Sequence, residues 1–170
     1  MNIAHFEKVS EDRFYRDSGS AGFLEGATDA LNNIVVIPRR STKCSAGYDF
    51  VSSIKIILMP GDSMLIPTGI RCKMDGNWVL MLYPRSSMGF KGLRLLNTTG
   101  IIDADYYNAK NEGHIMAKVI NDSELPLRID AGERFIQGVF VQYGTADEEE
   151  VTTERTTGTG IANEVHTYEI

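Results

Sequence analysis

Short apolar stretches, separated by turn residues, run along most of the chain. Most of these stretches are rich in β-branched or aromatic residues, which favour strands, and no segment sustains a helical period. The stretches predicted to be strands are Ile34–Ile37, Phe50–Met59, Ser63–Lys73, Trp78–Tyr83, Leu93–Asn97, His114–Ile120 and Arg134–Tyr143. Helix is expected only briefly, around Thr28–Asn33 and Ser86–Lys91.

Turn residues are frequent between the stretches, as in Pro60-Gly61-Asp62, Asp75-Gly76-Asn77 and Asp130-Ala131-Gly132. Many short strands with frequent turns are typical of a sandwich, a barrel or a jelly roll. The pattern therefore predicts one all-β domain over residues 1–145.

Two segments stand apart from this pattern. Residues 11–33 are rich in Gly, Ser, Asp and Asn but carry Phe14, Tyr15 and Phe23, so we expect an ordered insertion. Residues 146–170 begin with an acidic run and contain few large apolar side chains, too few for a core. They predict a C-terminal arm that is either mobile or packed on a neighbouring surface.

Composition narrows the class of protein. The chain has 170 residues, 42% of them hydrophobic and 24% charged, as in an ordinary globular domain. No apolar run is long enough to cross a bilayer or to serve as a signal peptide, so a cytoplasmic location is expected. The net charge of −6 argues against direct nucleic-acid binding but allows a small phosphorylated ligand. Cys44 and Cys72 are too few for a disulfide framework, and both are expected to be buried.

The richest candidate chemistry lies between residues 84 and 106. Arg85 offers a planar fork of donors and Ser86 and Ser87 offer hydroxyls, as a phosphate cradle requires. Asp103 follows two apolar residues, where a rigidly held carboxylate can act as a general base. Taken alone, each of these signals has a simpler interpretation: a charged turn for Arg-Ser-Ser, and a turn-closing carboxylate for Asp103.

The order and spacing of the motifs resemble the trimeric dUTP pyrophosphatases over most of residues 34–160. The segments that resemble the first four family motifs are Ala46–Phe50, Pro84–Ser87, Asn97–Tyr106 and Gly132–Gln137. The run from Tyr106 to Ile115 is similar to a longer third motif found in Gram-positive bacteria and their phages.

This resemblance implies a jelly-roll subunit of β-clip type and a homotrimer whose active sites are shared between subunits. It implies hydrolysis of dUTP to dUMP and pyrophosphate with Mg²⁺, which limits uracil incorporation into DNA and supplies dUMP. The magnesium would be chelated mainly by the phosphates, with Asp49 reaching its water shell.

The resemblance also assigns roles. Asp103 would activate the attacking water, and Ser86 would lie closest to the bond that breaks. Tyr106 would pack under the deoxyribose and exclude a 2′-hydroxyl. Asn97 and the backbone of the Leu93–Ile102 hairpin, including Gly100 and Ile102, would read the uracil. The phosphates would be held by Arg85, Ser87 and Gln137.

The fifth motif departs from the family pattern. Arg155, Gly158 and Thr159 fit a phosphate-covering turn, but the usual aromatic lid is missing. His166 or Tyr168, further along the chain, could supply a stacking ring instead.

Two alternatives remain open. A dCTP deaminase has a similar fold and Arg-Ser-Ser motif, and Glu112 could be its catalytic carboxylate. A regulatory protein of phage type would bind a protein partner through residues 11–33, although packing of that segment on its own subunit is favoured. His114 lacks a second His or Cys at ligand spacing, which indicates a structural role.

Overall fold

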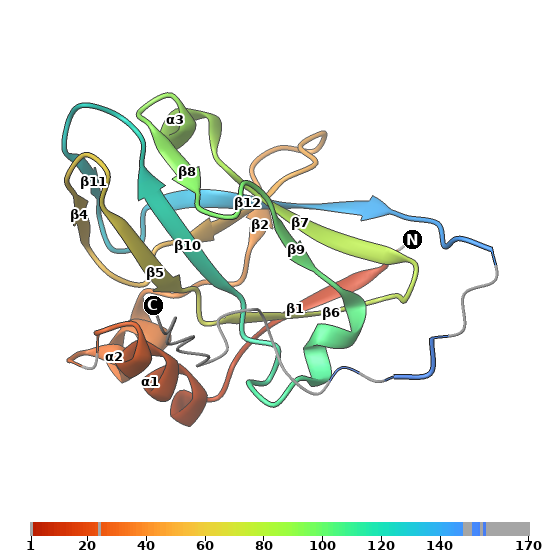
Figure 1. The fold of residues 1–170 in the computed structure, drawn as a ribbon. Helices are drawn as coiled ribbons and strands as arrows, with labels where there is room; N and C mark the ends of the chain where they lie inside the picture. The colour runs from red at the N-terminus through yellow and green to blue at the C-terminus, as the bar shows by residue number, and fades with distance from the viewer. Residues whose placement is uncertain (1, 24, 148–150, 154, 156–170) are drawn as a thin grey trace, which may run out of the picture.

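The computed structural model describes residues 2–23, 25–147, 151–153 and 155 (Figure 1). Strands dominate, so the all-β prediction is confirmed. The strands are β1 Ala4–Lys8, β2 Arg39–Arg40, β3 Tyr48–Val51, β4 Ile56–Leu58, β5 Ser63–Pro67, β6 Ile70–Met74, β7 Trp78–Pro84, β8 Leu93–Leu95, β9 Gly100–Ile102, β10 Met116–Asn121, β11 Leu127–Ile129 and β12 Arg134–Gln142. The helical segments are α1 Glu11–Ser20, α2 Ala27–Asn33, α3 Ser86–Gly89 and the 3₁₀ turn η1 Ala104–Asn108.

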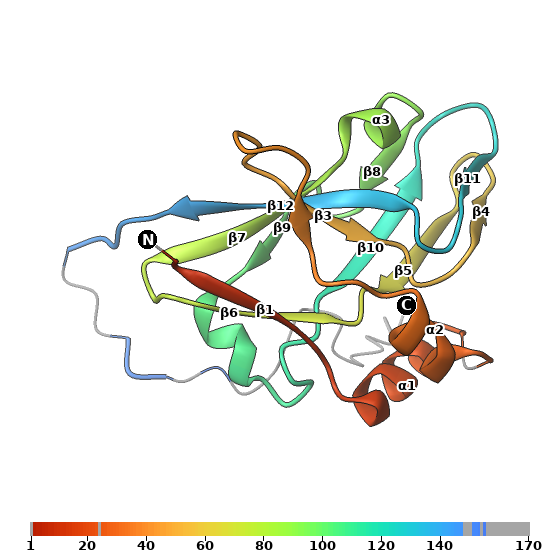
Figure 2. The same cartoon turned by 180° about the vertical axis from the view of Figure 1, so that it is seen from behind.

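The largest sheet has five strands in the order β2-β3-β12-β7-β9. A second sheet, β5-β10-β8, lies across it, and the pairs β1-β6 and β4-β11 complete the described strands (Figures 1 and 2). Their inner faces bury Phe50, Leu80, Phe135 and Ile66, each at most 1% exposed. This core anchors β7, which Arg85 directly follows, and β12, which carries Gln137.

Several strand predictions need correction. Ile34–Ile37 is not a strand: Val35 is buried and Val36 exposed, but no described strand pairs with them. Alternating burial alone does not make a strand without a hydrogen-bonded neighbour. The stretches Phe50–Met59 and Ser63–Lys73 each contain two strands, the second divided at Gly69, whose φ of 73° breaks the extended chain.

Residues 11–33 form α1 and α2, which pack against each other. Ser10 caps α1 by accepting a hydrogen bond from the Arg13 N–H at 3.1 Å, and Glu11 and Asp12 favour the positive N-terminus. The expectation of no sustained helix was therefore wrong here. It failed because the buried face of α1 carries Phe14 and Ser18, which give almost no apolar period.

The remaining expectations concern short elements and the thiols. The brief helices near residues 28–33 and 86–91 are confirmed as α2 and α3, whereas β1 was not predicted. Cys72 is buried, and burial raises the pKa of its thiol to about 12, so it is inert at neutral pH. Cys44 is exposed, contrary to expectation. No helix among the described residues is long and apolar enough to cross a membrane.

Candidate active site

The predicted site residues lie at opposite ends of β7. Arg85 directly follows the last residue of this strand, whereas Asp103 follows Ile102, which pairs with Leu80 near the first residue. The six residue steps from Val79 to Arg85 span about 20 Å in an extended strand. Figure 1 shows this separation, with α3 at one end of β7 and η1 near the other.

We name the two groups after the roles that the sequence predicted for them. The phosphate half comprises Asp49, Arg85, Ser86, Ser87 and Gln137. The nucleoside half comprises Asn97, Gly100, Ile102, Asp103 and Tyr106.

Strand pairing assembles the phosphate half. Gln137 on β12 lies opposite Asp49 on β3 and opposite Tyr83 on β7, so the carboxylate and the end of β7 are neighbours. Asp49 is 8% exposed, and its Oδ1 accepts from Arg85 Nε at 2.7 Å. A nearly buried carboxylate needs such partners, and this one fixes the direction of the guanidinium.

The other oxygen of Asp49 is also satisfied. Its Oδ2 accepts from Ser41 Oγ at 2.6 Å and from Arg134 Nη1 at 3.3 Å. Ser41 and Arg134 therefore support the phosphate half, and the sequence analysis missed both. Their signal is faint, because Ser41 lies in a Ser-Thr loop and Arg134 looks like an ordinary solvated strand end.

Gly47, in the first motif, leaves space for the side chain of Gln137. A Cβ atom on Gly47 would lie 2.2 Å from Gln137 Oε1, so only glycine lets the Gln137 side chain occupy its position. Gln137 Nε2 donates to the carbonyl of Pro84 at 3.3 Å, directly before Arg85. Ser86 and Ser87 are exposed at the start of α3, anchored by the buried Met88. The hydroxyls of Ser86 and Ser87, the amide of Gln137 and the guanidinium of Arg85 thus lie near the C-terminal end of β7.

The nucleoside half follows β9 at the edge of the same sheet. Gly100 and Ile102 are buried where β9 pairs with β7, so the prediction that they contact a ligand concerns their backbone. Ile101 points outward and is 53% exposed, a position that the alternation of the strand could have revealed. The expected Leu93–Ile102 hairpin needs correction: β8 pairs with β10, β9 pairs with β7, and the turn carrying the exposed Asn97 joins two sheets.

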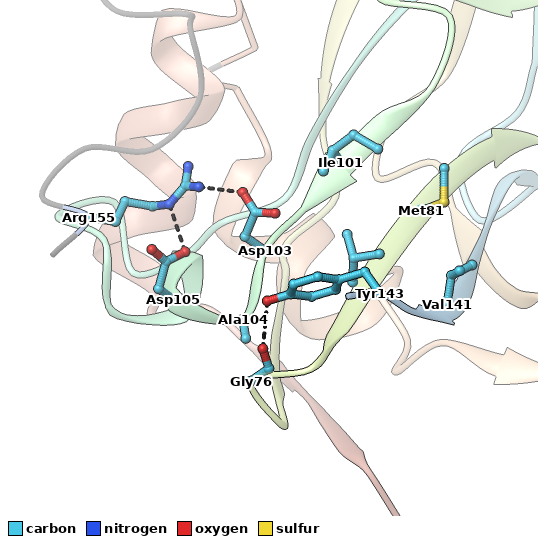
Figure 3. A pocket seen from close by; sticks show the side chains of 10 residues that line it. Gly76, Met81, Ile101, Asp103, Ala104, Asp105, Val141, Tyr143 and Arg155 are labelled. Atoms are coloured by element: carbon cyan, nitrogen blue, oxygen red, sulfur yellow. Dashed lines mark hydrogen bonds and ion pairs between the residues drawn. The ribbon is translucent and has the colours of Figure 1, made fainter. Parts of the chain in front are cut away.

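A cavity of about 730 Å³ opens beside Ile101 and Asp103 (Figure 3). Met81, Val79 and Val141 form its apolar floor. Asp103, Asp105 and Arg155 lie at its rim, where Arg155 Nη2 bonds Asp103 and Arg155 Nε bonds Asp105 Oδ1 at 2.8 Å. The Asp103 side chain is 42% exposed, so its carboxylate remains open to water.

Tyr106 lies deeper than the rest of the nucleoside half. It is 2% exposed, its hydroxyl donates to the His114 carbonyl at 2.6 Å, and Asn111 Nδ2 donates to the hydroxyl at 2.7 Å. A ring held in this way is a fixed wall rather than a movable lid. Arg155 is the last described residue, so the predicted Gly158 and Thr159, and the alternative rings of His166 and Tyr168, lie outside the described residues.

Metal ligands do not cluster in the part of the chain that the structure describes: no three His, Cys, Asp or Glu side chains converge there. Asp49 has both oxygens engaged by neighbours, which suits contact with a hydrated ion better than direct ligation.

Glu112, the candidate of the deaminase alternative, faces the N-terminal segment instead of the cavity. Its carboxylate accepts from Ser10 N at 2.9 Å and from Ser10 Oγ at 2.6 Å. Burial opposes its ionisation, but these hydrogen bonds outweigh burial and hold the pKa of Glu112 below its ordinary value. The side chain is therefore committed to a structural contact.

The chain is similar to known proteins over most of its length. The dUTPase family model matches residues 33–167. The deoxyuridine 5′-triphosphate nucleotidohydrolase of Lactococcus lactis subsp. lactis is 43% identical over 141 residues, which are 81% of this chain and 94% of that protein. The corresponding protein of Nautilia profundicola is 37% identical and covers 75% of this chain and 90% of its own.

Solved structures are similar as well. The crystal structure of the dUTPase from Streptococcus mutans has a TM-score of 0.64 at 36% identity, covering 84% of this chain and 98% of that one. A mutant dUTPase of Staphylococcus bacteriophage 80alpha, solved with dUpNHpp, has the same TM-score at 22% identity and covers 90% of this chain and 98% of its own. The expected jelly-roll subunit is confirmed by these likenesses.

Proposed function

The chain belongs to the dUTPase family, and from this premise we propose how its residues hydrolyse dUTP to dUMP and pyrophosphate. The observation that carries the proposal is the separation of the two halves along β7. A base and a phosphate clamp that act on one α-phosphate must lie within a few ångströms of it, and about 20 Å of strand divides them here.

We infer that each active site combines the nucleoside half of one subunit with the phosphate half of another. Relatives of this family supply the precedent for a homotrimer, whose cyclic symmetry would join the halves in three equivalent sites. Residues 146–170 are then an arm, with Arg155 as the part of it that reaches the nucleoside half. The proposed location is the cytoplasm, where nucleotide pools turn over.

In this site Asp103 takes the proton from the water that attacks the α-phosphorus. Its partly exposed carboxylate is anchored at the end of β9, as a general base requires. Asn97 and the backbone of Gly100 and Ile102 contact the uracil, and Tyr106 is the wall beneath the sugar. Arg85, Ser86, Ser87 and Gln137 hold the phosphates, with Ser86 beside the bond that breaks, and the arm residues Arg155, Gly158 and Thr159 cover them.

Mg²⁺ is the proposed cofactor, and it would neutralise charge on the departing pyrophosphate. The side chains fit an ion held mainly by the substrate. Asp49, already paired with Arg85 and Arg134, is suited to orient waters of the ion's shell.

The alternatives receive less support. The Glu112 carboxylate is held by Ser10, at a distance from the cavity, which weighs against deamination of dCTP. The hypothesis that a protein partner binds through residues 11–33 also has less support, because Phe14 is buried and α1 packs on its own subunit.

Release of pyrophosphate from the common ribo- and deoxyribonucleoside triphosphates, with Mg²⁺ and with a chelator, tests the proposal. We expect release from dUTP alone and its loss with the chelator. Ammonia release from dCTP would instead support the deaminase.

A further inference from the structure

The N-terminal segment of residues 7–17 lies along the loop of residues 107–114, which follows the sugar wall of Tyr106. We call these segments the N-terminal clamp and the clamped loop. Figures 1 and 2 both show α1 beside this loop. Each contact joins residues about a hundred positions apart in the chain: Tyr107 Oη donates to Glu7 at 2.9 Å, and Ser10 Oγ donates to Glu112 at 2.6 Å.

The innermost contact is between Asp17 and His114. His114 has no exposed surface, and its Nε2 accepts from the Gly69 N–H at 2.9 Å. Nε2 therefore carries no proton, so Nδ1 carries one and donates to Asp17 Oδ2 at 2.6 Å. Burial lowers the pKa of His114 while the Asp17 hydrogen bond opposes this, and a neutral ring satisfies both neighbours.

The clamped loop grips Tyr106 directly. The Tyr106 hydroxyl donates to the carbonyl of His114 itself at 2.6 Å. Glu112 has a φ of 60°, and Gly113, with a φ of 66°, passes so close that a Cβ atom there would lie 2.7 Å from the Tyr106 carbonyl oxygen. The clamped loop thus packs on the Tyr106 backbone through Gly113 and holds the Tyr106 hydroxyl through His114, so a shift of the loop would disturb both contacts.

We propose that Asp17 and His114 are positioning residues that set the preference for dUTP over UTP. They act through Tyr106: α1 fixes the His114 ring, the His114 backbone fixes the Tyr106 hydroxyl, and the ring then leaves no room for a 2′-hydroxyl. This inference rests on the proposed function, in which Tyr106 lies beneath the sugar. Displacements of about 1 Å are enough to change such discrimination strongly.

The test compares Asp17→Ala with Asp12→Ala. Asp12 lies on the same helix, and its replacement removes the same charge, but among the described residues its carboxylate pairs with Arg16, four residues further along α1. For Asp17→Ala we expect the ratio of kcat/KM for dUTP to kcat/KM for UTP to fall about tenfold or more. Asp12→Ala should keep the wild-type ratio, and Asp17→Asn, which still accepts from His114 Nδ1, should restore most of it.

An unchanged ratio in a folded Asp17→Ala protein would overturn the inference. Should that variant fail to fold, the nitrogen resonances of the wild-type imidazoles decide: His114 must be neutral and protonated on Nδ1, and protonation on Nε2 would overturn it equally. A wild-type protein that releases no pyrophosphate from dUTP contradicts the proposed function instead, so the two failures are distinguishable.

Discussion

The phosphate half and the nucleoside half are built in different ways. Strand register brings the phosphate half together in the middle of the largest sheet, where Asp49 is satisfied by Arg85, Ser41 and Arg134. The nucleoside half lies on and just after the edge strand β9. Arg155, which lies outside the sheet, pairs with Asp103 and with the neighbouring Asp105.

The two halves therefore differ in which segments of the chain supply their supporting contacts. The contacts that hold Asp49 in the phosphate half all come from the same chain. The nucleoside half depends on added segments: the N-terminal clamp behind Tyr106 and the C-terminal Arg155 in front of Asp103. Substitutions in the phosphate half should therefore reduce the stability of the fold, whereas substitutions in the nucleoside half should mainly reduce turnover.

The largest effect is expected at the base. Asp103→Asn keeps the shape of the side chain but cannot take a proton, so turnover should fall at least ~100-fold while dUTP affinity is nearly kept. Asp105→Asn is the matched control, because Asp105 also pairs with Arg155 but has no assigned proton transfer. Steady-state kinetics and calorimetric titration measure both, and wild-type turnover in Asp103→Asn would remove this residue from the mechanism.

Arg85→Ala should reduce turnover less than Asp103→Asn does, but it should destabilise the fold more. Loss of one charge-assisted phosphate contact corresponds to about 2 kcal/mol, or roughly 30-fold in kcat/KM. Asp49, 8% exposed, would lose the closer of its two arginine partners, which destabilises the fold by about 1–3 kcal/mol. Denaturant unfolding measures this cost; removal of the exposed pair partner in Arg128→Ala should change stability by much less.

Arg155→Ala tests whether the arm completes the nucleoside half. Arg155 is partly exposed, so we expect a loss of about fivefold in kcat/KM, with the oligomer intact. Truncation after Glu150 removes the whole arm and should lower turnover further. Full activity of the truncated protein would show that the arm is dispensable.

Acidification should produce the smallest of these effects, through His114 in the clamped loop. The pKa of buried His114 lies below the ordinary value near 6.5, so the unfolded chain binds this proton more readily than the folded one. Its contribution to stability is full above about pH 6.5 and is lost as the pH falls below that value. Between pH 7.5 and pH 5.5 the melting temperature should fall further for the wild-type protein than for His114→Gln. Equal falls in melting temperature would indicate that the ring is charged in the folded protein.

The sequence predicted the β class because turn residues and strand alternation are local signals, whereas the members of both halves were assigned from the resemblance of the motifs. It did not predict α1, whose inner face carries Ser18, nor the pairing of His114 with Asp17, which joins residues far apart in the chain. It also did not reveal that Asp103 and Arg85 lie at opposite ends of β7, since this depends on the register of β9.

The central claim is that an active site needs halves from different subunits. Asp103→Asn and Arg85→Ala chains, each impaired alone, can be unfolded, mixed in equal amounts and refolded together. In a cyclic trimer with random mixing, about a quarter of the sites should pair an intact Asp103 with an intact Arg85 from the next subunit. Activity should then recover to about a quarter of the wild-type value. Recovery to no more than the average of the two separate variants would contradict the shared-site account.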